Sequence, residues 1–480
     1  MRRRLLQHLL LLVTVTSLTF LTACSGTSSS GAGGSAATGG AGGSTATGGA
    51  GGTPVVDCDA EIGFEEGCGP FTLADFAGGA SAIIDNPDQS GINTTAKVLE
   101  LQKLEDENFG GSTLTLEESV DWSAGTAFVA KVWSSRPVNL LFKLEGSDIE
   151  LENVQTDSSA WQEVCFDFAG QTDAPDATGI TFIFDLGIVG KADSNPTSWT
   201  FYVDGIQQAD GCAPREEVTY ELIFEDEFDS GEQPSSATWN FETGYGVNDS
   251  GWGNNEWQLY TSSTDNVRLE DGNLVIQALC PVEPCGIRDD TVTSARITTQ
   301  DKFEFRYGKV EARIKPPVGK AAWPAFWALG ANFPEIGWPV SGEIDFMEAF
   351  NAFSASGDRM THFTMHWCDD SNLAPAPCEF DGGWTFLSKS LTLEESLGDD
   401  FHIFSAEWDE TKIIGSIDGI EYYIRSINPE TMAEFQREFF LILNVAMGGT
   451  LGSNNQAPNG SEVFPQTMLV DWVRVYERVD

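Results

Sequence analysis

Residues 342–348 read Gly-Glu-Ile-Asp-Phe-Met-Glu, so three carboxylates are interleaved with large apolar side chains. This alternation predicts a β-strand, because successive side chains of a strand point to opposite faces. Glu343 and Asp345 then share one face, whereas Glu348, at an odd offset from Glu343, falls on the other. A β-bulge of one extra residue around Phe346-Met347 restores the parity, and we expect it to place all three acids in one row.

Such a row of acids would be costly to bury against a partner sheet, whereas it forms a site if it faces a cleft. Strand steps of roughly 3.3 Å allow the carboxyls of Glu343 and Glu348 to lean toward each other, to the separation of about 5–5.5 Å that retaining glycosidases use. The alternative is a solvated edge strand whose acids have no role. The apolar residues Ile344, Phe346 and Met347 favour a central strand.

Residues 338–348, Trp-Pro-Val-Ser-Gly-Glu-Ile-Asp-Phe-Met-Glu, resemble the active-site strand of glycoside hydrolase family 16 in its bulged, laminarinase-type form. Four further segments are similar to the same family: Gly-Trp-Gly-Asn-Asn-Glu-Trp-Gln-Leu-Tyr-Thr (251–261), Ser-Ala-Arg-Ile (294–297), Trp-Pro-Ala-Phe-Trp (323–327) and Val-Asp-Trp-Val-Arg-Val-Tyr (470–476). The resemblance covers about residues 218–480. It implies an endo-β-1,3-glucanase with a concanavalin-like curved β-jelly-roll sandwich and a substrate cleft across the concave sheet.

The resemblance also implies a role for each acid. Glu343 is expected to be the nucleophile, Glu348 the acid/base, and Asp345 a hydrogen-bond partner of the nucleophile. Three acids this close cannot all be ionised cheaply, so we expect the pKa of one to rise and Glu348 to stay protonated for leaving-group departure. No metal or other cofactor is needed for this chemistry.

Six further residues resemble the sugar-binding residues of the family: Asn255, Arg296, Trp323, Trp327, Trp338 and His366. Trp323 and Trp327 are four apart and therefore share one strand face, where indole rings can stack on a sugar chain. Core packing is the alternative for either ring. A hydrogen-bonded strand histidine with no role is the alternative for His366.

A structural calcium ion is also implied by the resemblance, on the convex face of the second domain. Asp471 would bind it with its side chain, and Glu227 and Gly272 through main-chain carbonyls. Oxygen ligands at strand ends suit calcium. An acid-rich surface with no ion explains the same residues.

Short strand patterns fill the rest of the chain and predict an all-β protein. Val310, Ala312 and Ile314 alternate with charged residues, as in a half-buried strand. Residues 414–423 indicate a hairpin that turns at Asp-Gly. Only residues 431–439 have a helical pattern.

We divide the chain into four parts: a lipoprotein signal peptide (1–24), a flexible linker rich in Gly, Ser, Ala and Thr (25–54), a β-sandwich similar to a carbohydrate-binding module (55–215) and the catalytic domain (216–480). In the third part, residues 63–65 and 201–206 resemble the first and last strands of jelly-roll carbohydrate-binding modules. That resemblance implies a structural calcium bound by Glu65 and Asp204.

The signal peptide begins with Met1-Arg2-Arg3-Arg4 and continues as an apolar run to Phe20. Leu21-Thr22-Ala23-Cys24 resembles a bacterial lipobox, which implies cleavage before Cys24 and a lipid anchor on its thiol. Ser25 in the next position is similar to outer-membrane sorting in Gram-negative bacteria. We therefore expect an exported protein anchored to the cell envelope; the alternatives are an ordinary signal peptide with secretion and, less favoured, a single-pass anchor.

Eight cysteines remain after Cys24, an even number that predicts structural disulfides in an exported protein. Cys280 with Cys285 and Cys368 with Cys378 each flank a short loop and predict local staples. The other four cysteines allow three pairings: Cys58, Cys68, Cys165 and Cys212.

Acidic residues outnumber basic ones by 73 to 26, for a formal charge of −47. Such a field repels nucleic acid, anionic membranes and strongly anionic polysaccharides, so it favours a neutral substrate or a cation. Adaptation to salty water is an equal explanation. The 14 tryptophans suit carbohydrate binding, although large β-sandwich cores also use tryptophan. We expect a monomer.

The leading prediction is a retaining endo-β-1,3-glucanase that hydrolyses laminarin-like β-glucans. The alternatives are a hydrolase of another β-glycan (mixed-linkage β-1,3-1,4-glucan, agarose or carrageenan), a glycan transglycosylase, and a surface protein that binds sugar without catalysis. The negative charge disfavours a sulfated substrate, and the intact acids disfavour a protein without catalysis.

Overall fold

The computed structural model describes residues 62–479, except 69–70, 147–149, 156–157, 170–176, 214–217, 351–356, 369–377, 379–383 and 430. The predicted signal peptide, the linker and Cys58 lie outside the described residues. No helix in the described part of the chain is long and apolar enough to cross a membrane.

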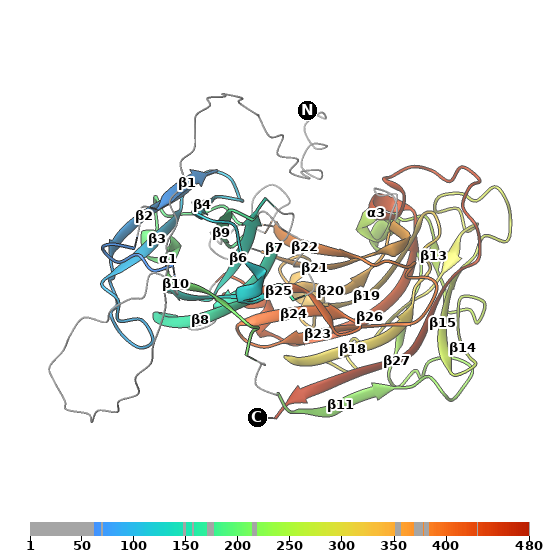
Figure 1. The fold of residues 1–480 in the computed structure, drawn as a ribbon. Helices are drawn as coiled ribbons and strands as arrows, with labels where there is room; N and C mark the ends of the chain where they lie inside the picture. Colours follow the sequence, from blue (N-terminus) through green and yellow to red (C-terminus); the bar gives the residue numbers. More distant parts are fainter. Residues whose placement is uncertain are drawn as a thin grey trace, which may run out of the picture. The chain divides into compact units, whose positions relative to one another are not determined.

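The strands up to residue 209 form two five-stranded antiparallel sheets (Figure 1). One has the order β1 (Thr72–Phe76), β4 (Gly111–Thr115), β9 (Gly179–Phe184), β6 (Val138–Glu145), β7 (Glu150–Gln155). The other has the order β2 (Gly79–Asp85), β3 (Lys97–Lys103), β10 (Thr200–Ala209), β5 (Ala127–Ser134), β8 (Ala160–Asp167). Both sheets contribute to one apolar core, in which Phe142 stacks on Phe166 with ring centroids 4.7 Å apart. We call this part the first sandwich.

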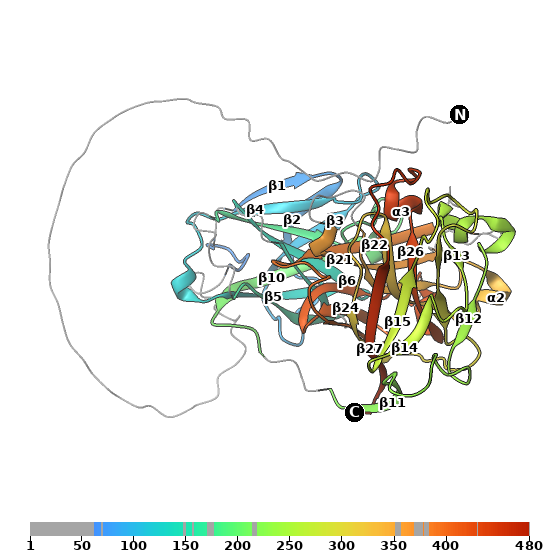
Figure 2. The same ribbon diagram turned by 90° about the vertical axis from the view of Figure 1, so that its right-hand side faces the viewer.

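The strands from residue 220 onward form a second sandwich. Its larger sheet has the order β14 (Val267–Glu270), β15 (Asn273–Ala278), β27 (Gln466–Arg478), β18 (Gly308–Lys315), β23 (His402–Trp408), β24 (Lys412–Ile417), β25 (Ile420–Ser426), and β11 (Tyr220–Asp226) also pairs with β27. Figure 2 shows β14, β15 and β27 side by side in this sheet. As predicted, Val310, Ala312 and Ile314 of β18 are buried, and the charged residues between them are half-buried.

The other sheet of the second sandwich has seven strands in the order β12 (Asn240–Glu242), β17 (Arg296–Thr298), β26 (Phe439–Met447), β19 (Ala322–Gly330), β20 (Glu343–Glu348), β21 (Met360–Cys368), β22 (Trp384–Thr392). A short parallel pair, β13 (Leu259–Tyr260) and β16 (Thr293–Ser294), stands apart from it. Figure 1 shows the two large sheets as stacked layers. One face of the seven-stranded sheet packs into the core through Ile297, Leu443, Phe326, Ile344 and Phe363. We call the opposite face the open face.

The all-β fold class is confirmed, since the described helices are single turns: α1 (Pro196–Trp199), α2 (Phe333–Ile336), α3 (Gly449–Ser453), η1 (Trp122–Ala124), η2 (Val247–Asp249), η3 (Gly251–Asn255), η4 (Gly357–Arg359) and η6 (Ala433–Gln436). The hairpin of β24 and β25 turns at Asp418-Gly419 as predicted, and both residues have the positive φ that this tight turn requires. The helical pattern over 431–439 is wrong beyond the one turn of η6, because Phe439 already starts β26.

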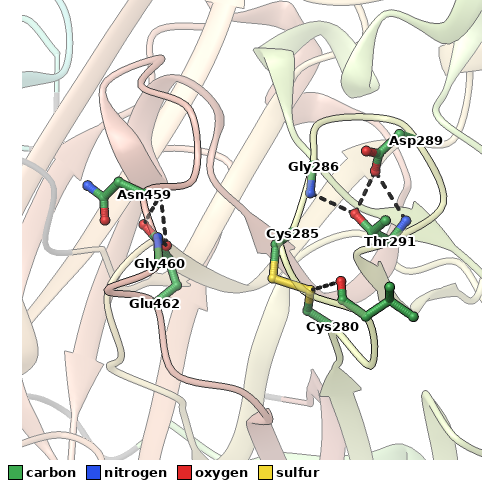
Figure 3. Close-up of a disulfide and its surroundings, with 9 residues drawn as sticks. Cys280, Cys285, Gly286, Asp289, Thr291, Asn459, Gly460 and Glu462 are labelled. Atoms are coloured by element: carbon green, nitrogen blue, oxygen red, sulfur yellow. Dashed lines mark hydrogen bonds between the residues drawn. A yellow bond between two sulfur atoms is a disulfide. The ribbon is translucent and has the colours of Figure 1, made fainter.

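Both predicted local disulfides are present, Cys280–Cys285 and Cys368–Cys378. Figure 3 shows the first of them beside a small loop in which Thr291 Oγ1 accepts from Gly286 N (2.7 Å) and donates to Asp289 Oδ1 (2.6 Å). Among the three pairings left open by the sequence, the structure joins Cys165 to Cys212.

Candidate active site

The predicted bulge in β20 is confirmed. On one side, Trp327 of β19 pairs with Asp345 and Phe326 pairs with Met347, so Phe346 is the extra residue. Phe346 and Met347 both point into the core, where they are 1% and 0% exposed. Two consecutive inward residues shift the alternation by one. The bulge therefore places all three acids of β20 on the open face.

These acids are shielded from water: Asp345 is 4% and Glu348 8% exposed. The pKa of Glu343 is raised to about 8, first by burial and then by repulsion from Asp345. Burial and then the charge of Glu348 raise the pKa of Asp345 well above its usual range. Burial also raises the pKa of Glu348, in the direction expected from the sequence. The three acids therefore bind protons more tightly than free carboxyls do, and they titrate together.

Two side chains contact the carboxyl of Glu348. The indole N–H of Trp323 donates to Oε1 over 2.8 Å, and Thr364 Oγ1 lies 3.5 Å from Oε2. Thr364 Oγ1 also lies 2.9 Å from Ser388 Oγ of β22. Both contacts to Glu348 favour its charged form and so oppose the rise of its pKa from burial. Because Trp323 occupies Oε1, a proton on Glu348 belongs on Oε2.

His366 of β21 lies beside the other two acids. Its Nε2 is 3.6 Å from Glu343 Oε1 and 3.5 Å from Asp345 Oδ2. Its Nδ1 accepts a hydrogen bond of 3.3 Å from the indole N–H of Trp384, so the neutral ring carries its proton on Nε2, toward the acids. The two acids and His366 could in principle hold a metal ion. However, a metal-binding histidine normally donates from its second nitrogen, and here that nitrogen accepts. The arrangement suits a shared proton better than a metal.

Arg296 of β17 lies between two indole rings on the open face. Its guanidinium carbon is 4.6 Å from the ring of Trp252 and 4.8 Å from the ring of Trp327, and it forms an ion pair with Glu242. Both separations are within the range of cation–π attraction. The sequence reasoning missed Trp252, although this residue lies within the 251–261 motif.

A directed chain of hydrogen bonds fixes the indole of Trp327. Its N–H donates to Asn444 Oδ1 (2.7 Å), and Asn444 Nδ2 donates to the Tyr260 hydroxyl (3.1 Å). That hydroxyl donates to Oε2 of Glu256 (3.3 Å). The same oxygen also accepts a hydrogen bond from Gln258 Nε2 (2.6 Å). Glu256 is 5% exposed and ends the chain as its only pure acceptor. We call this chain the Trp327 relay.

The remaining predicted substrate-binding residues differ in how far they are exposed to solvent. Trp323 is 8% exposed and is engaged by Glu348, so it supports the acid instead of offering an open ring. Trp338, just before β20, packs 5.8 Å from His366 and 5.5 Å from Trp384 between ring centroids. Asn255 is exposed on η3 and donates to Asn455 Oδ1 over 3.2 Å. Among the predicted tryptophans, Trp327 and Trp338 thus remain the candidates for sugar stacking.

The structure adds β22, which the sequence reasoning left out. Trp384, Phe386 and Ser388 of this strand reach the open face beside the acids. The alternating Trp-Thr-Phe pattern signals a strand. Its place next to β21 depends on long-range pairing, which no local pattern reveals.

At the first predicted calcium site, a carboxylate oxygen is placed to bind a cation. Glu65 Oε1 accepts from the backbone N–H groups of Ala96 and Lys97. Asp204 Oδ2 accepts from Thr95 Oγ1 (2.6 Å), while its buried Oδ1 has no hydrogen bond. Both carboxylates thus converge on residues 95–97, and one buried oxygen is left for a cation. The residues fit a calcium ion.

The second predicted calcium site does not fit as well. β11 ends just before Glu227 and β15 begins just after Gly272, and both strands pair with β27. However, Glu227 accepts two short bonds from Arg474 (2.7 and 2.8 Å), and Asp471 pairs with Arg313 at 2.6 Å. Arg313 already neutralises the carboxylate of Asp471, the one side chain expected to bind the ion, so we derive no calcium chemistry there.

Buried acids in a row, flanked by aromatic rings on one face of a β-sandwich, define a glycoside hydrolase. The family model "Glycosyl hydrolases family 16" matches residues 254–474. A β-glucanase of Rhodothermus marinus is 34% identical over 273 residues, which cover 54% of this chain and 86% of that protein. The chain therefore belongs to glycosyl hydrolase family 16, and the predicted family is confirmed.

Two other proteins are similar over the same half of the chain. Glucan endo-1,3-beta-glucosidase A1 of Niallia circulans is 36% identical over 273 residues, 53% of this chain and 38% of that protein, so the chain spans little more than a third of its length. The laminarinase catalytic domain of Thermotoga maritima is 38% identical, with a TM-score of 0.45, and the match covers 54% of this chain and 99% of that domain.

Proposed function

We propose that this protein is an endo-acting β-1,3-glucanase that hydrolyses laminarin-like β-glucans with retention of the anomeric configuration. The observation that carries the proposal is the bulge at Phe346, which turns the half-buried Glu343 and the buried Asp345 and Glu348 toward the open face. The names of the similar proteins, a glucan endo-1,3-beta-glucosidase and a beta-glucanase, support the substrate class.

In the first step a carboxylate oxygen of Glu343 attacks the anomeric carbon while the glycosidic bond breaks. The leaving oxygen takes the proton from Oε2 of Glu348, the oxygen that Trp323 leaves open. In the second step water attacks the same carbon, gives its proton to Glu348 and releases Glu343. Two inversions at one carbon give net retention.

Glu343 must be ionised to attack, although its pKa is raised to about 8. Electrostatic interactions with His366 and Arg296 lower this pKa and so oppose the effect of burial. Burial and the charge of Glu348 also raise the pKa of Asp345 well above its usual range, and its carboxyl lies 3.5 Å from His366 Nε2, so Asp345 can hold a proton while Glu343 is ionised. We infer that Asp345 holds the shared proton and leaves Glu343 charged.

The open face suits a neutral sugar chain. Trp327, held by its relay, and Trp338 offer ring faces to pyranose rings, while the acidic surface repels anionic polymers. We further propose that the first sandwich binds the same polymer, and that lipidation of Cys24 anchors the protein to the outside of the cell envelope.

Digestion of laminarin, lichenan and agarose, with products separated by chromatography and their anomers followed by NMR, tests the proposal. We expect short β-1,3-linked products from laminarin, with the β-anomer formed first. Glu343→Gln and Glu348→Gln should each lose at least about a thousandfold of kcat, since each removes a group that acts in the transition state. Glu477→Gln, an exposed acid at the end of β27, is the matched control.

A good leaving group adds a sharper test, because it departs without a proton. Glu348→Gln should recover activity on an aryl β-glucoside oligosaccharide, and Glu343→Gln should not. Preferred cleavage of lichenan or agarose, products longer than the substrate, or activity of either variant within tenfold of wild type would overturn the proposal.

A further inference from the structure

Phe386 is an exposed ring in line with the nucleophile. Glu343 of β20 pairs with His366 of β21, which pairs with Phe386 of β22. Directly paired residues share a sheet face, so the three side chains form one row across the open face. Phe386 is 40% exposed, while Phe326 and Phe363 on the core face of the same sheet are fully buried.

The rings around Phe386 have nearly parallel planes. His366 and Trp384 differ by 2°, Trp384 and Phe386 by 22°, and His366 and Phe386 by 23°. The ring centroids lie 5.1 to 5.8 Å apart. Parallel rings at this spacing form an offset stack, which fixes the orientation of Phe386, and the 40% exposure of Phe386 leaves part of its ring open for stacking on a pyranose ring.

Folding alone gives no reason for a phenylalanine at position 386. The open-face positions that follow Phe386 in β22 are exposed and polar, as at Ser388 and Ser390, and the alternate positions Leu387 and Leu391 pack against the core. β22 also ends the described sheet order, where a large exposed apolar side chain invites aggregation. Such a side chain is more consistent with a binding role.

We propose that Phe386 and Trp384 form a distal sugar-binding subsite, in which the exposed ring of Phe386, supported by the stacked ring of Trp384, stacks on one pyranose ring of the β-glucan. This subsite rests on the proposed glucanase function and deepens it. Because β22 lies two strand spacings from β20, about 10 Å, the ring bound there is not the sugar that reacts. This sugar ring belongs to the part of the glucan that extends past His366, so the subsite favours longer glucans over short oligosaccharides.

Steady-state kinetics of Phe386→Ala on laminarin and on the shortest laminari-oligosaccharide that the wild type cleaves will test the subsite. We expect KM for laminarin to rise about threefold to tenfold with kcat unchanged, the size of one lost aromatic contact. Kinetics on the shortest oligosaccharide should not change. Phe386→Trp should restore the laminarin KM, and Ser390→Ala, on the same face of the same strand, should leave both substrates unaffected.

An equal loss of kcat/KM on both substrates would show general damage to the enzyme and would overturn the subsite. Wild-type KM values for Phe386→Ala would also overturn it. Binding separates this inference from the function. If the wild type fails to cleave laminarin, the proposed function falls, while affinity electrophoresis of wild type and Phe386→Ala in gels with laminarin, lichenan or agarose still tests the subsite. Equal retardation of the two proteins by every glycan would overturn it. Similar melting temperatures are expected, because the replaced ring is exposed.

Discussion

The indole N–H of Trp323 donates to Oε1 of Glu348 over 2.8 Å, from beneath the open face. The two residues come from neighbouring strands, β19 and β20. The bond favours the charged form of Glu348 and so lowers the pKa that burial raises. A tryptophan expected to hold sugar therefore also sets the proton affinity of the candidate acid.

Trp323→Phe tests this relationship. Loss of the donor should raise the pKa of Glu348, and since an acid catalyst works while protonated, the alkaline limb of kcat against pH should move to higher pH. Trp367→Phe makes the same change on the core face and should not move the limb. A limb that stays in place, or moves to lower pH, contradicts the assignment of Glu348 as the acid.

Glu343→Gln should stabilise the protein at neutral pH. The carboxyl has a pKa of about 8 in the fold against 4.5 as a free side chain, so its contribution to stability is complete below pH 4.5 and is lost as the pH rises toward 8. An amide has no charge to bury. Differential scanning calorimetry should show a melting temperature higher than wild type by at least about 2 °C at pH 7.5.

The same variant should match wild type at pH 4, where the carboxyl is neutral in both states. Glu477→Gln, which replaces an exposed acid, should change neither value. A stabilisation of equal size at both pH values would indicate a packing effect and not the removal of a buried charge.

Tyr260→Phe should weaken substrate binding through the Trp327 relay. The variant removes the hydroxyl that accepts from Asn444 and donates to Glu256, so Trp327 loses its fixed orientation. We expect KM for laminarin to rise about threefold or more with a smaller change in kcat, and tryptophan fluorescence to change. Tyr422→Phe, another buried tyrosine of the second sandwich, is the control. Unchanged KM in Tyr260→Phe would show that the relay does not position Trp327.

Asp204→Asn tests the calcium ion of the first sandwich. If the buried Oδ1 binds calcium, the melting temperature of the wild type should fall in EDTA and recover in excess CaCl2. The variant should be insensitive to both. Asp471→Asn, whose carboxylate pairs with Arg313, should keep the wild-type response. A wild-type melting temperature that is the same in EDTA and CaCl2 would argue against the ion.

Cys24→Ala should release the protein from the membrane fraction, because the lipobox-like sequence predicts a lipid on this thiol. Specific activity on laminarin should not change, since the catalytic residues are far along the chain. Detergent partitioning of cells that express each form is a direct measurement. Membrane association that persists in the variant would exclude Cys24 as the anchor.

Local patterns in the sequence were sufficient to predict several features of the structure. The alternation in β20 and the odd offset of Glu348 predicted the bulge, because side-chain parity is a property of a single strand. The Asp418-Gly419 hairpin followed from turn chemistry, and the two short disulfide loops followed from spacing alone. The family 16 motifs were equally local.

Tertiary structure decided which side chains meet. The pairing of β21 with β22 brings Phe386 beside His366 and Trp384 Nε1 onto His366 Nδ1. The sequence between the two strands carries no signal of this pairing. Arg313 of β18 reaches Asp471 of β27 across the sheet, so the sequence around Asp471 did not reveal the competing charge at the expected calcium site. Strand parity is set within a few residues, whereas partners across a sheet depend on long-range register and burial.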